Sequence, residues 1–271
     1  MKDTHYVIKS ILEMRKEPES RSEVVSQGIF SEEVKILEEK SDWVRIMTLV
    51  DHYSGWTKKE GICTRSSPYG KEEAVAIVTV NRLSAHLYEG SDTIYGPILT
   101  LPFESRLAVI DFNSRWLTAV LPDGRKAFIQ RGDITQNHHF LEKKTIGDFS
   151  RKFLGLPYTW GGRSSFGYDC SGFVQMLYRQ MGIFLPRDSQ DQFTASSFVE
   201  SSIEALEAGD LLFWGYSKDQ IRHVGLALGE GYFIHTSAVT ENMPYIRISH
   251  IHDKAWNGSG YYPFLAGRKF E

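Results

Sequence analysis

The chain has 271 residues, of which 41% are hydrophobic and 24% charged, with a formal net charge of −3 at pH 7. This length is enough for one large domain or for two to three smaller ones with their own cores. The balanced charge argues against the clustered basic surface of nucleic-acid-binding proteins, so we expect no nucleic-acid partner. No apolar run approaches the length of a membrane span, so we expect no membrane-spanning segment.

Cysteine usage and the first residues bear on the compartment. The two cysteines, Cys63 and Cys170, form neither a disulfide framework nor a CxxC zinc motif. The first residues lack the apolar segment of a signal peptide, so the sequence as written predicts a cytoplasmic protein. If a signal peptide had been removed, a periplasmic or secreted location would be expected instead.

The first 140 residues have a β-rich pattern with a weak internal repeat. Short alternating runs at 34–37 and 43–46 lie between turn clusters and predict strands. Val34 precedes Trp43 by nine positions, as Leu107 precedes Trp116, and each tryptophan begins a strand, a polar turn and a second strand. We therefore predict two small β-barrels, at 1–70 and 71–140, joined at the turn-rich segment 65–70.

The pattern changes to α+β over residues 141–271. Apolar spacing predicts a helix at 141–154, and a glycine-rich loop at 160–167 precedes a second helix at 171–181. Strands are predicted at 210–214, 223–228 and 232–236. Helices come first and strands after, as in an α+β domain.

Cys170 is the candidate nucleophile. It opens the second helix, with Asp169 as the expected N-cap, and the positive end of the helix dipole should lower the pKa of the thiol. The alternative is a buried structural cysteine. The glycines of the preceding loop, Gly161, Gly162 and Gly167, favour a reactive thiol, because a core cysteine needs no cleared space around it.

His223 and His235 are the candidate bases. They lie on two predicted strands joined at 229–231. If the hairpin is centred on Glu230, the two side chains share a face and meet on the diagonal. One imidazole could then accept the thiol proton while the other fixes its tautomer. A register shifted by one residue would place them on opposite faces.

A metal centre or a bound cofactor is not expected. His250 and His252 share a face of a predicted strand, but a third ligand at a recognisable spacing is missing from the sequence. We interpret these histidines as solvated side chains.

Several segments resemble, in order, the motifs of NlpC/P60 cysteine peptidases: residues 157–162, 169–173, 208–211, 223–225 and 235. The resemblance covers about residues 141–271 and implies a papain-like α+β fold. It also implies that Cys170 is the nucleophile, that His223 is the general base and that His235 orients it. Tyr158 would help to stabilise the oxyanion.

The N-terminal repeats resemble bacterial SH3 domains. Together, the domains resemble γ-D-glutamyl-L-diamino acid endopeptidases of the YkfC type, also called dipeptidyl-peptidase VI. Such enzymes release L-Ala-D-Glu from murein tripeptides and tetrapeptides that have a free N-terminal L-alanine. The resemblance implies a first SH3-like domain that gates the cleft and these peptides as partners. We expect a monomer, although the sequence leaves the oligomeric state open. The diamino acid, lysine or diaminopimelate, stays open.

A free α-ammonium group requires carboxylate and phenol oxygens around it, because an unpaired buried charge is costly. Asp169 and Tyr53 could supply them, with Glu17 as a weaker third candidate. Alternatively, Asp169 acts chiefly as a helix cap, a role compatible with substrate binding, Tyr53 is an ordinary turn tyrosine and Glu17 is a solvated charge. Four further side chains are expected along the substrate path: Ser171, Asp188, Ser189 and Trp160.

Two other functions stay open. A broader wall hydrolase could use the SH3-like domains to bind polymeric peptidoglycan, and a wall-binding protein could lack catalysis. The complete set of Cys170, His223 and His235 favours an enzyme over the second alternative.

Overall fold

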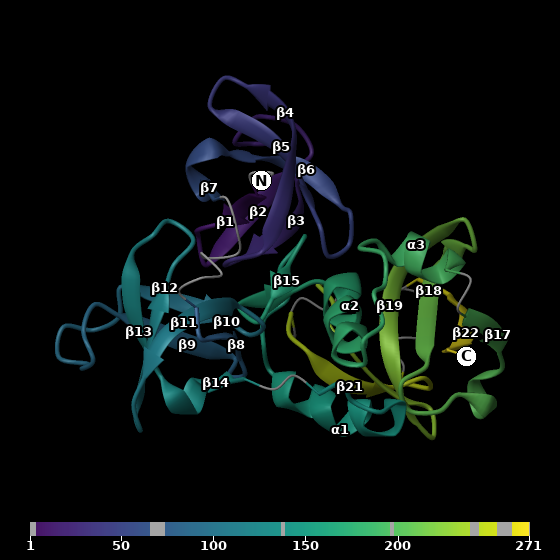
Figure 1. Cartoon of the computed structure of the whole chain (residues 1–271). Helices are drawn as coiled ribbons and strands as arrows, with labels where there is room; N and C mark the ends of the chain where they lie inside the picture. Colours follow the sequence, from purple (N-terminus) through teal and green to yellow (C-terminus); the bar gives the residue numbers. More distant parts are fainter. Residues whose placement is uncertain are drawn as a thin grey trace. The chain divides into compact units, whose positions relative to one another are not determined.

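The computed structural model describes residues 4–65, 74–136, 139–195, 198–238, 244–253 and 262–270 (Figure 1). The chain divides into two compact units. The first comprises Met1–His139 with Ser164–Phe166, and the second comprises Phe140–Arg163 with Gly167–Glu271. No helix among the described residues is both long and apolar enough to cross a membrane. Most of the segment predicted to join the two barrels, residues 66–70, lies outside the described residues.

The first unit contains two antiparallel sheets with equivalent topology. Within residues 4–65, the first sheet has the strand order β3-β2-β6-β5-β4-β1-β7. Its strands are β1 (Thr4–Val7), β2 (Ile11–Arg15), β3 (Val24–Ile29), β4 (Glu33–Lys40), β5 (Trp43–Thr48), β6 (Ser54–Lys58) and β7 (Ile62–Arg65). A 3₁₀ turn, η1 (Lys59–Gly61), precedes the last strand.

Within residues 74–136, the second sheet has the order β10-β9-β13-β12-β11-β8-β14, which repeats the first order with each label raised by seven. Its strands are β8 (Ala76–Val80), β9 (Ser84–Tyr88), β10 (Leu99–Pro102), β11 (Arg106–Phe112), β12 (Trp116–Val120), β13 (Lys126–Gln130) and β14 (Ile134–Thr135). The turn η2 (Arg131–Asp133) corresponds to η1. The internal repeat read from Trp43 and Trp116 is confirmed, because each tryptophan begins the equivalent strand.

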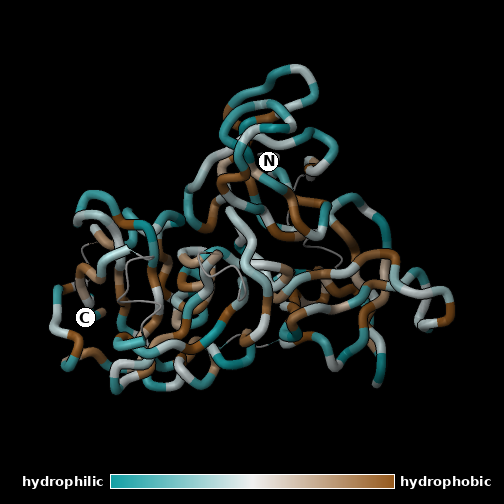
Figure 2. Tube along the Cα trace, turned by 180° about the vertical axis from the view of Figure 1, so that it is seen from behind, coloured by the Kyte–Doolittle hydropathy of each residue, from teal (hydrophilic) through white to brown (hydrophobic). Residues whose placement is uncertain are grey.

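Each sheet has its own apolar core. Met14, Val44 and Ile46 are buried in the first, and Leu87 and Leu107 are buried in the second. Hydrophilic residues dominate the outer loops (Figure 2). The alternation of buried and exposed residues along these strands explains why period-2 patterns identified them.

The second unit places short helices before an antiparallel sheet. Its helical elements are η3 (Lys143–Thr145), α1 (Ile146–Ser150), η4 (Arg151–Phe153), α2 (Cys170–Gln180), α3 (Ser189–Thr194) and η5 (Ile203–Ala205). In the described part, the strand order of the main sheet is β17-β22-β18-β19-β20-β21. These strands are β17 (Phe198–Ser201), β18 (Leu211–Ser217), β19 (Gln220–Gly229), β20 (Tyr232–His235), β21 (Arg247–His250) and β22 (Phe264–Phe270). A separate pair comprises β15 (Arg163–Ser164) and β16 (Gly167–Tyr168).

The helix predicted at 141–154 differs from the structure, which has three short helical pieces there. The hydroxyl of Ser150 donates to the carbonyl of Gly147 at 2.6 Å, and the hydroxyl of Thr145 donates to that of Glu142 at 2.8 Å. Such local side-chain bonds compete with regular helical pairing. The second predicted helix is confirmed as α2, one residue earlier at each end.

Close backbone packing holds the start of α2 against the glycine-rich loop. The N–H of Asp169 donates to the carbonyl of Gly162 at 3.0 Å. A Cβ atom built on Gly172 would lie 2.3 Å from the Gly162 oxygen, and one on Gly162 would lie 2.4 Å from the Gly167 oxygen. Neighbouring backbone therefore occupies the space at Gly162 and Gly172.

We expect Gly172→Ala to destabilise the protein by about 1–3 kcal/mol, because the new methyl group would overlap the Gly162 carbonyl. In an ordinary helix the same change stabilises by about 1 kcal/mol. Urea unfolding monitored by tryptophan fluorescence measures the difference. Gly132→Ala is the control, since a Cβ there meets nothing within 4 Å. Equal stability of the two variants would contradict the packing argument.

Candidate active site

Cys170 is the first residue of α2, and Asp169 is its N-cap, as predicted. The Asp169 carboxylate accepts the N–H of Gly172 at 2.7 Å and the hydroxyl of Ser171 at 3.2 Å. The cap thus fixes the first turn of the helix that carries the thiol.

Arg187 binds the same carboxylate with both terminal nitrogens. Its Nη1 lies 3.1 Å from Oδ1 of Asp169 and its Nη2 lies 2.5 Å from Oδ2. Nη1 also donates to Ser171 Oγ at 2.9 Å. The run Arg187-Asp188-Ser189 contributed to the family resemblance, but only Asp188 and Ser189 were given a place in the site. The ion pair with Asp169 was not predicted.

The hairpin register that would pair the two histidines is confirmed. Leu226 pairs with Ile234 and Ala227 pairs with Phe233, so the turn lies at Gly229–Gly231 as expected. His223 Nε2 and His235 Nδ1 are 3.0 Å apart, and both side chains are buried. The two imidazoles therefore share one face of β19 and β20.

The histidine chain continues to Ser249 on β21, which no sequence pattern indicated. His235 Nε2 lies 3.1 Å from Ser249 Oγ. Since His223 uses Nε2 toward His235, its Nδ1 is the nitrogen suited to accept a thiol proton. No local motif marks Ser249, because its position depends on the pairing of β20 with β21.

The thiol of Cys170 lies beside the strand that carries His223. The backbone N–H of Val224 hydrogen bonds to the thiol, and α2 packs against β19 (Figure 1). Cys170 keeps partial exposure. The residue is therefore not fully enclosed, and its thiol is next to the residue that follows His223.

The thiol is not activated in the way the sequence predicted. Burial raises the pKa of the Cys170 thiol to about 12, and the negative charge of Asp169 adds to this effect. Hydrogen bonds from the backbone N–H groups of Val224 and Ser171 and the charge of Arg187 oppose the increase but are weaker. The prediction of a lowered thiol pKa is wrong, because loss of hydration outweighs the helix dipole.

Both imidazoles are kept neutral. Burial lowers the pKa of His223 to about 3, with a further contribution from the positive charge of Arg247. Burial, His223 and Arg247 lower the pKa of His235 well below its usual value. These shifts favour a neutral thiol beside neutral imidazoles in the resting site.

Tyr158 lies near the thiol, as the motif implied. Burial is the main reason that the pKa of its phenol is raised, and the nearby Cys170 and Asp169 raise it further. Its backbone N–H donates to the carbonyl of Pro244 at 2.7 Å. The phenol stays protonated and can donate a hydrogen bond.

The other residues predicted to contact substrate differ in exposure and belong to different units. Trp160 is 63% exposed, Asp188 is exposed and Ser189 begins α3. Tyr53 and Glu17 belong to the first unit, where Tyr53 packs against an apolar core and Glu17 is exposed. Their contacts with substrate stay predictions.

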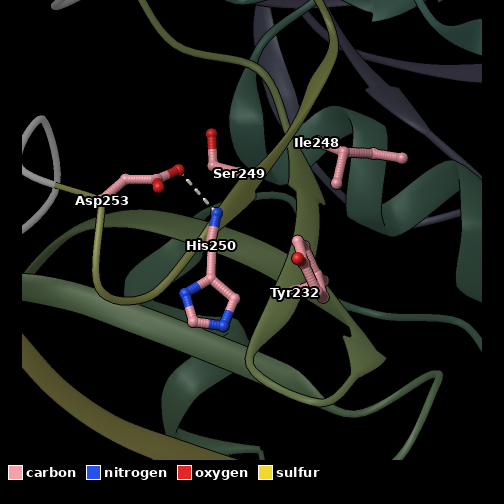
Figure 3. A pocket seen from close by; sticks show the side chains of 5 residues that line it. All are labelled: Tyr232, Ile248, Ser249, His250 and Asp253. Atoms are coloured by element: carbon pink, nitrogen blue, oxygen red, sulfur yellow. Dashed lines mark hydrogen bonds between the residues drawn. The ribbon is translucent and has the colours of Figure 1, made fainter.

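A pocket of about 300 Å³ lies beside β21 (Figure 3). It is lined by Tyr232, Ile248, Ser249, His250 and Asp253. The imidazole of His250 contacts the ring of Tyr232 and leaves the strand on the side opposite to the Ser249 hydroxyl. The part of the chain that the structure describes holds no group of three or more His, Cys, Asp or Glu residues able to bind a metal.

Comparison with known proteins agrees with this geometry. Residues 155–259 match the NlpC/P60 family, and residues 14–62 match the bacterial dipeptidyl-peptidase SH3 domain. Over 225 residues, the chain is 31% identical to a γ-D-glutamyl-L-lysine dipeptidyl-peptidase of Bacillus subtilis (strain 168), covering 79% of this chain and 72% of that protein. The chain belongs to the NlpC/P60 family.

Further relatives cover most of this NlpC/P60 protein. It is 28% identical over 258 residues to a γ-D-glutamyl-L-lysine dipeptidyl-peptidase of Bacillus cereus (strain ATCC 10987), covering 90% of this chain and 74% of that protein. The crystal structure of an NlpC/P60 family protein from the same strain superposes with a TM-score of 0.83, at 22% identity and 99% coverage of both chains. The predicted fold, an NlpC/P60 domain after SH3-like domains, is confirmed, and the protein is a cysteine peptidase.

We expect Arg187→Met to lower the free energy of unfolding by about 3–5 kcal/mol, because it leaves the buried Asp169 carboxylate without its cation. Urea unfolding measures this loss. Arg222→Met, at an exposed arginine of the same unit, is the matched control and should change stability little. Similar losses of unfolding free energy in both variants would show that the ion pair contributes no more to stability than an exposed arginine does.

The pH dependence should follow the neutral imidazoles. Because the pKa of His223 is about 3 in the folded protein, protonation should disable the base only well below pH 6.5. The acid limb of kcat/KM is thus expected below that pH. Arg247→Gln removes a nearby positive charge and should move the limb upward. A limb at or above pH 6.5 in the unaltered protein would contradict the assignment.

Proposed function

We propose that this peptidase hydrolyses the bond between γ-D-glutamate and an L-diamino acid in murein peptides with a free N-terminal L-alanine, releasing L-Ala-D-Glu. The catalytic part rests on one observation. His223 and His235 are in contact at 3.0 Å, and the next residue, Val224, hydrogen bonds to the Cys170 thiol through its backbone N–H. The substrate class rests on the names of the two Bacillus relatives.

In the first half of the reaction, Cys170 Sγ attacks the γ-carbonyl carbon while His223 Nδ1 takes the thiol proton. The oxyanion accepts hydrogen bonds from the Tyr158 phenol and from the backbone N–H of Cys170, which is at a helix position without an intrahelical acceptor. The C–N bond then breaks, and His223 returns the proton to the leaving amine of the diamino acid. A thioester between Cys170 and the γ-carboxyl of D-glutamate remains.

In the second half, water attacks the thioester. His223 takes a proton from this water and returns it to the sulfur as the C–S bond breaks. L-Ala-D-Glu leaves with a free γ-carboxyl group. His235 holds the imidazole of His223 in the required tautomer during both halves.

Recognition of the L-alanine ammonium group involves Asp169, Tyr53 and Glu17 in this proposal. Arg187 already neutralises the Asp169 carboxylate. Asp169 can then orient an ammonium group, but its charge is already balanced.

The test is cleavage of L-Ala-γ-D-Glu-L-Lys and its diaminopimelate equivalent, each with a free or an acetylated N-terminus, followed by chromatography of the products. We expect L-Ala-D-Glu from the free peptides and at least about a hundredfold lower kcat/KM for the acetylated ones, since a lost buried charge contact costs about 3 kcal/mol. Cys170→Ala should abolish cleavage, and Cys63→Ala should retain it.

Two results would contradict this proposal. Equal rates on free and acetylated peptides would remove the recognition of the ammonium group. Degradation of intact sacculi at rates comparable with those on free peptides would instead favour a broader wall hydrolase.

A further inference from the structure

We propose that Ser249 is a positioning residue of this active site, whose hydroxyl accepts a hydrogen bond from His235 Nε2 and so stabilises the tautomers of His235 and His223 that catalysis needs. The inference rests on the catalytic roles given to the two histidines in the proposed function. It adds a fourth side chain to the set of Cys170, His223 and His235.

The sheet places Ser249 next to His235 by strand pairing. On β20 and β21, His235 is opposite Arg247 and Phe233 is opposite Ser249. Ser249 is therefore diagonal to His235 on the same face, at a distance that side chains can span. Its Oγ lies 3.1 Å from His235 Nε2, and Ser249 is buried, with 7% of its surface exposed.

The direction of the proton chain gives this contact its importance. To accept the thiol proton at Nδ1, neutral His223 must carry its own proton on Nε2 and donate it to His235 Nδ1. His235 must then be protonated on Nε2, and Ser249 Oγ is the acceptor for that proton. In the other tautomer of His235, the Nδ1 proton would face the Nε2 proton of His223. His223 would then move its proton to Nδ1 and could not act as the base.

The charges around His223 and His235 favour a neutral hydrogen-bond partner over a carboxylate next to the pair. Arg247 is opposite His235, and its positive charge disfavours an imidazolium at either histidine. A carboxylate in the place of Ser249 would stabilise an imidazolium, whereas a hydroxyl accepts a hydrogen bond without adding charge. Ser249 therefore matches a site whose imidazoles are neutral at rest.

Substitutions at Ser249 have to separate the loss of the hydroxyl from a change in side-chain volume. Ser249→Ala changes both the hydroxyl and the volume of the side chain. Ser249→Thr and Ser249→Val are a better pair, because they have the same shape, suit a strand and differ only in the hydroxyl.

The test measures alkylation of Cys170 by iodoacetamide in a Cys63→Ala background, between about pH 5 and about pH 9, where an ordinary histidine titrates. This rate reports how readily His223 takes the thiol proton and requires no peptide. We expect the threonine variant to react within about twofold of the parent and the valine variant about tenfold more slowly, as for the loss of one hydrogen bond. Thermal unfolding should be similar for the two variants.

Equal alkylation rates for the threonine and valine variants would overturn the proposal, and so would a loss in the valine variant matched by lower thermal stability. On L-Ala-γ-D-Glu-L-Lys, the valine variant should lower kcat and leave KM unchanged. If the parent protein fails to cleave this peptide, the proposed substrate is wrong. The alkylation ratio would still decide the role of Ser249.

Discussion

The ion pair between Arg187 and Asp169 fixes the start of α2, on which the other parts of the active site depend. Asp169 caps the helix through the N–H of Gly172, and Arg187 binds both oxygens of its carboxylate and the hydroxyl of Ser171. Such a buried pair is tolerated only with complete hydrogen bonding. This network holds the first turn of α2, which begins with Cys170 and packs against β19.

Burial also favours the neutral forms of Cys170 and His223. The raised pKa of Cys170 and the lowered pKa of His223 have the same first cause, the removal of water. Both directions favour neutral partners over a thiolate–imidazolium pair at rest. Charge separation is deferred until a substrate carbonyl is present, when the oxyanion donors can stabilise the charge that forms.

Sequence patterns predicted what depends on local spacing. The repeat of the N-terminal sheets, the cap at Asp169 and the hairpin that pairs His223 with His235 follow from periodicity and turn residues. The contacts of Arg187 with Asp169 and of Ser249 with His235 could not be predicted in this way, because the residues between the partners show no regular sequence pattern. The thiol pKa was missed since burial is a property of the folded sheet and helix together, and a helix dipole is small beside desolvation.

The neutral ion pair also separates catalysis from recognition of the substrate. With its charge balanced by Arg187, Asp169 presents a dipole toward a ligand and contributes little net attraction for an ammonium group. The same balance limits the field of Asp169 at Cys170, where an uncompensated carboxylate would raise the thiol pKa further. A charge strong enough to bind the amino terminus is therefore better placed away from the nucleophile.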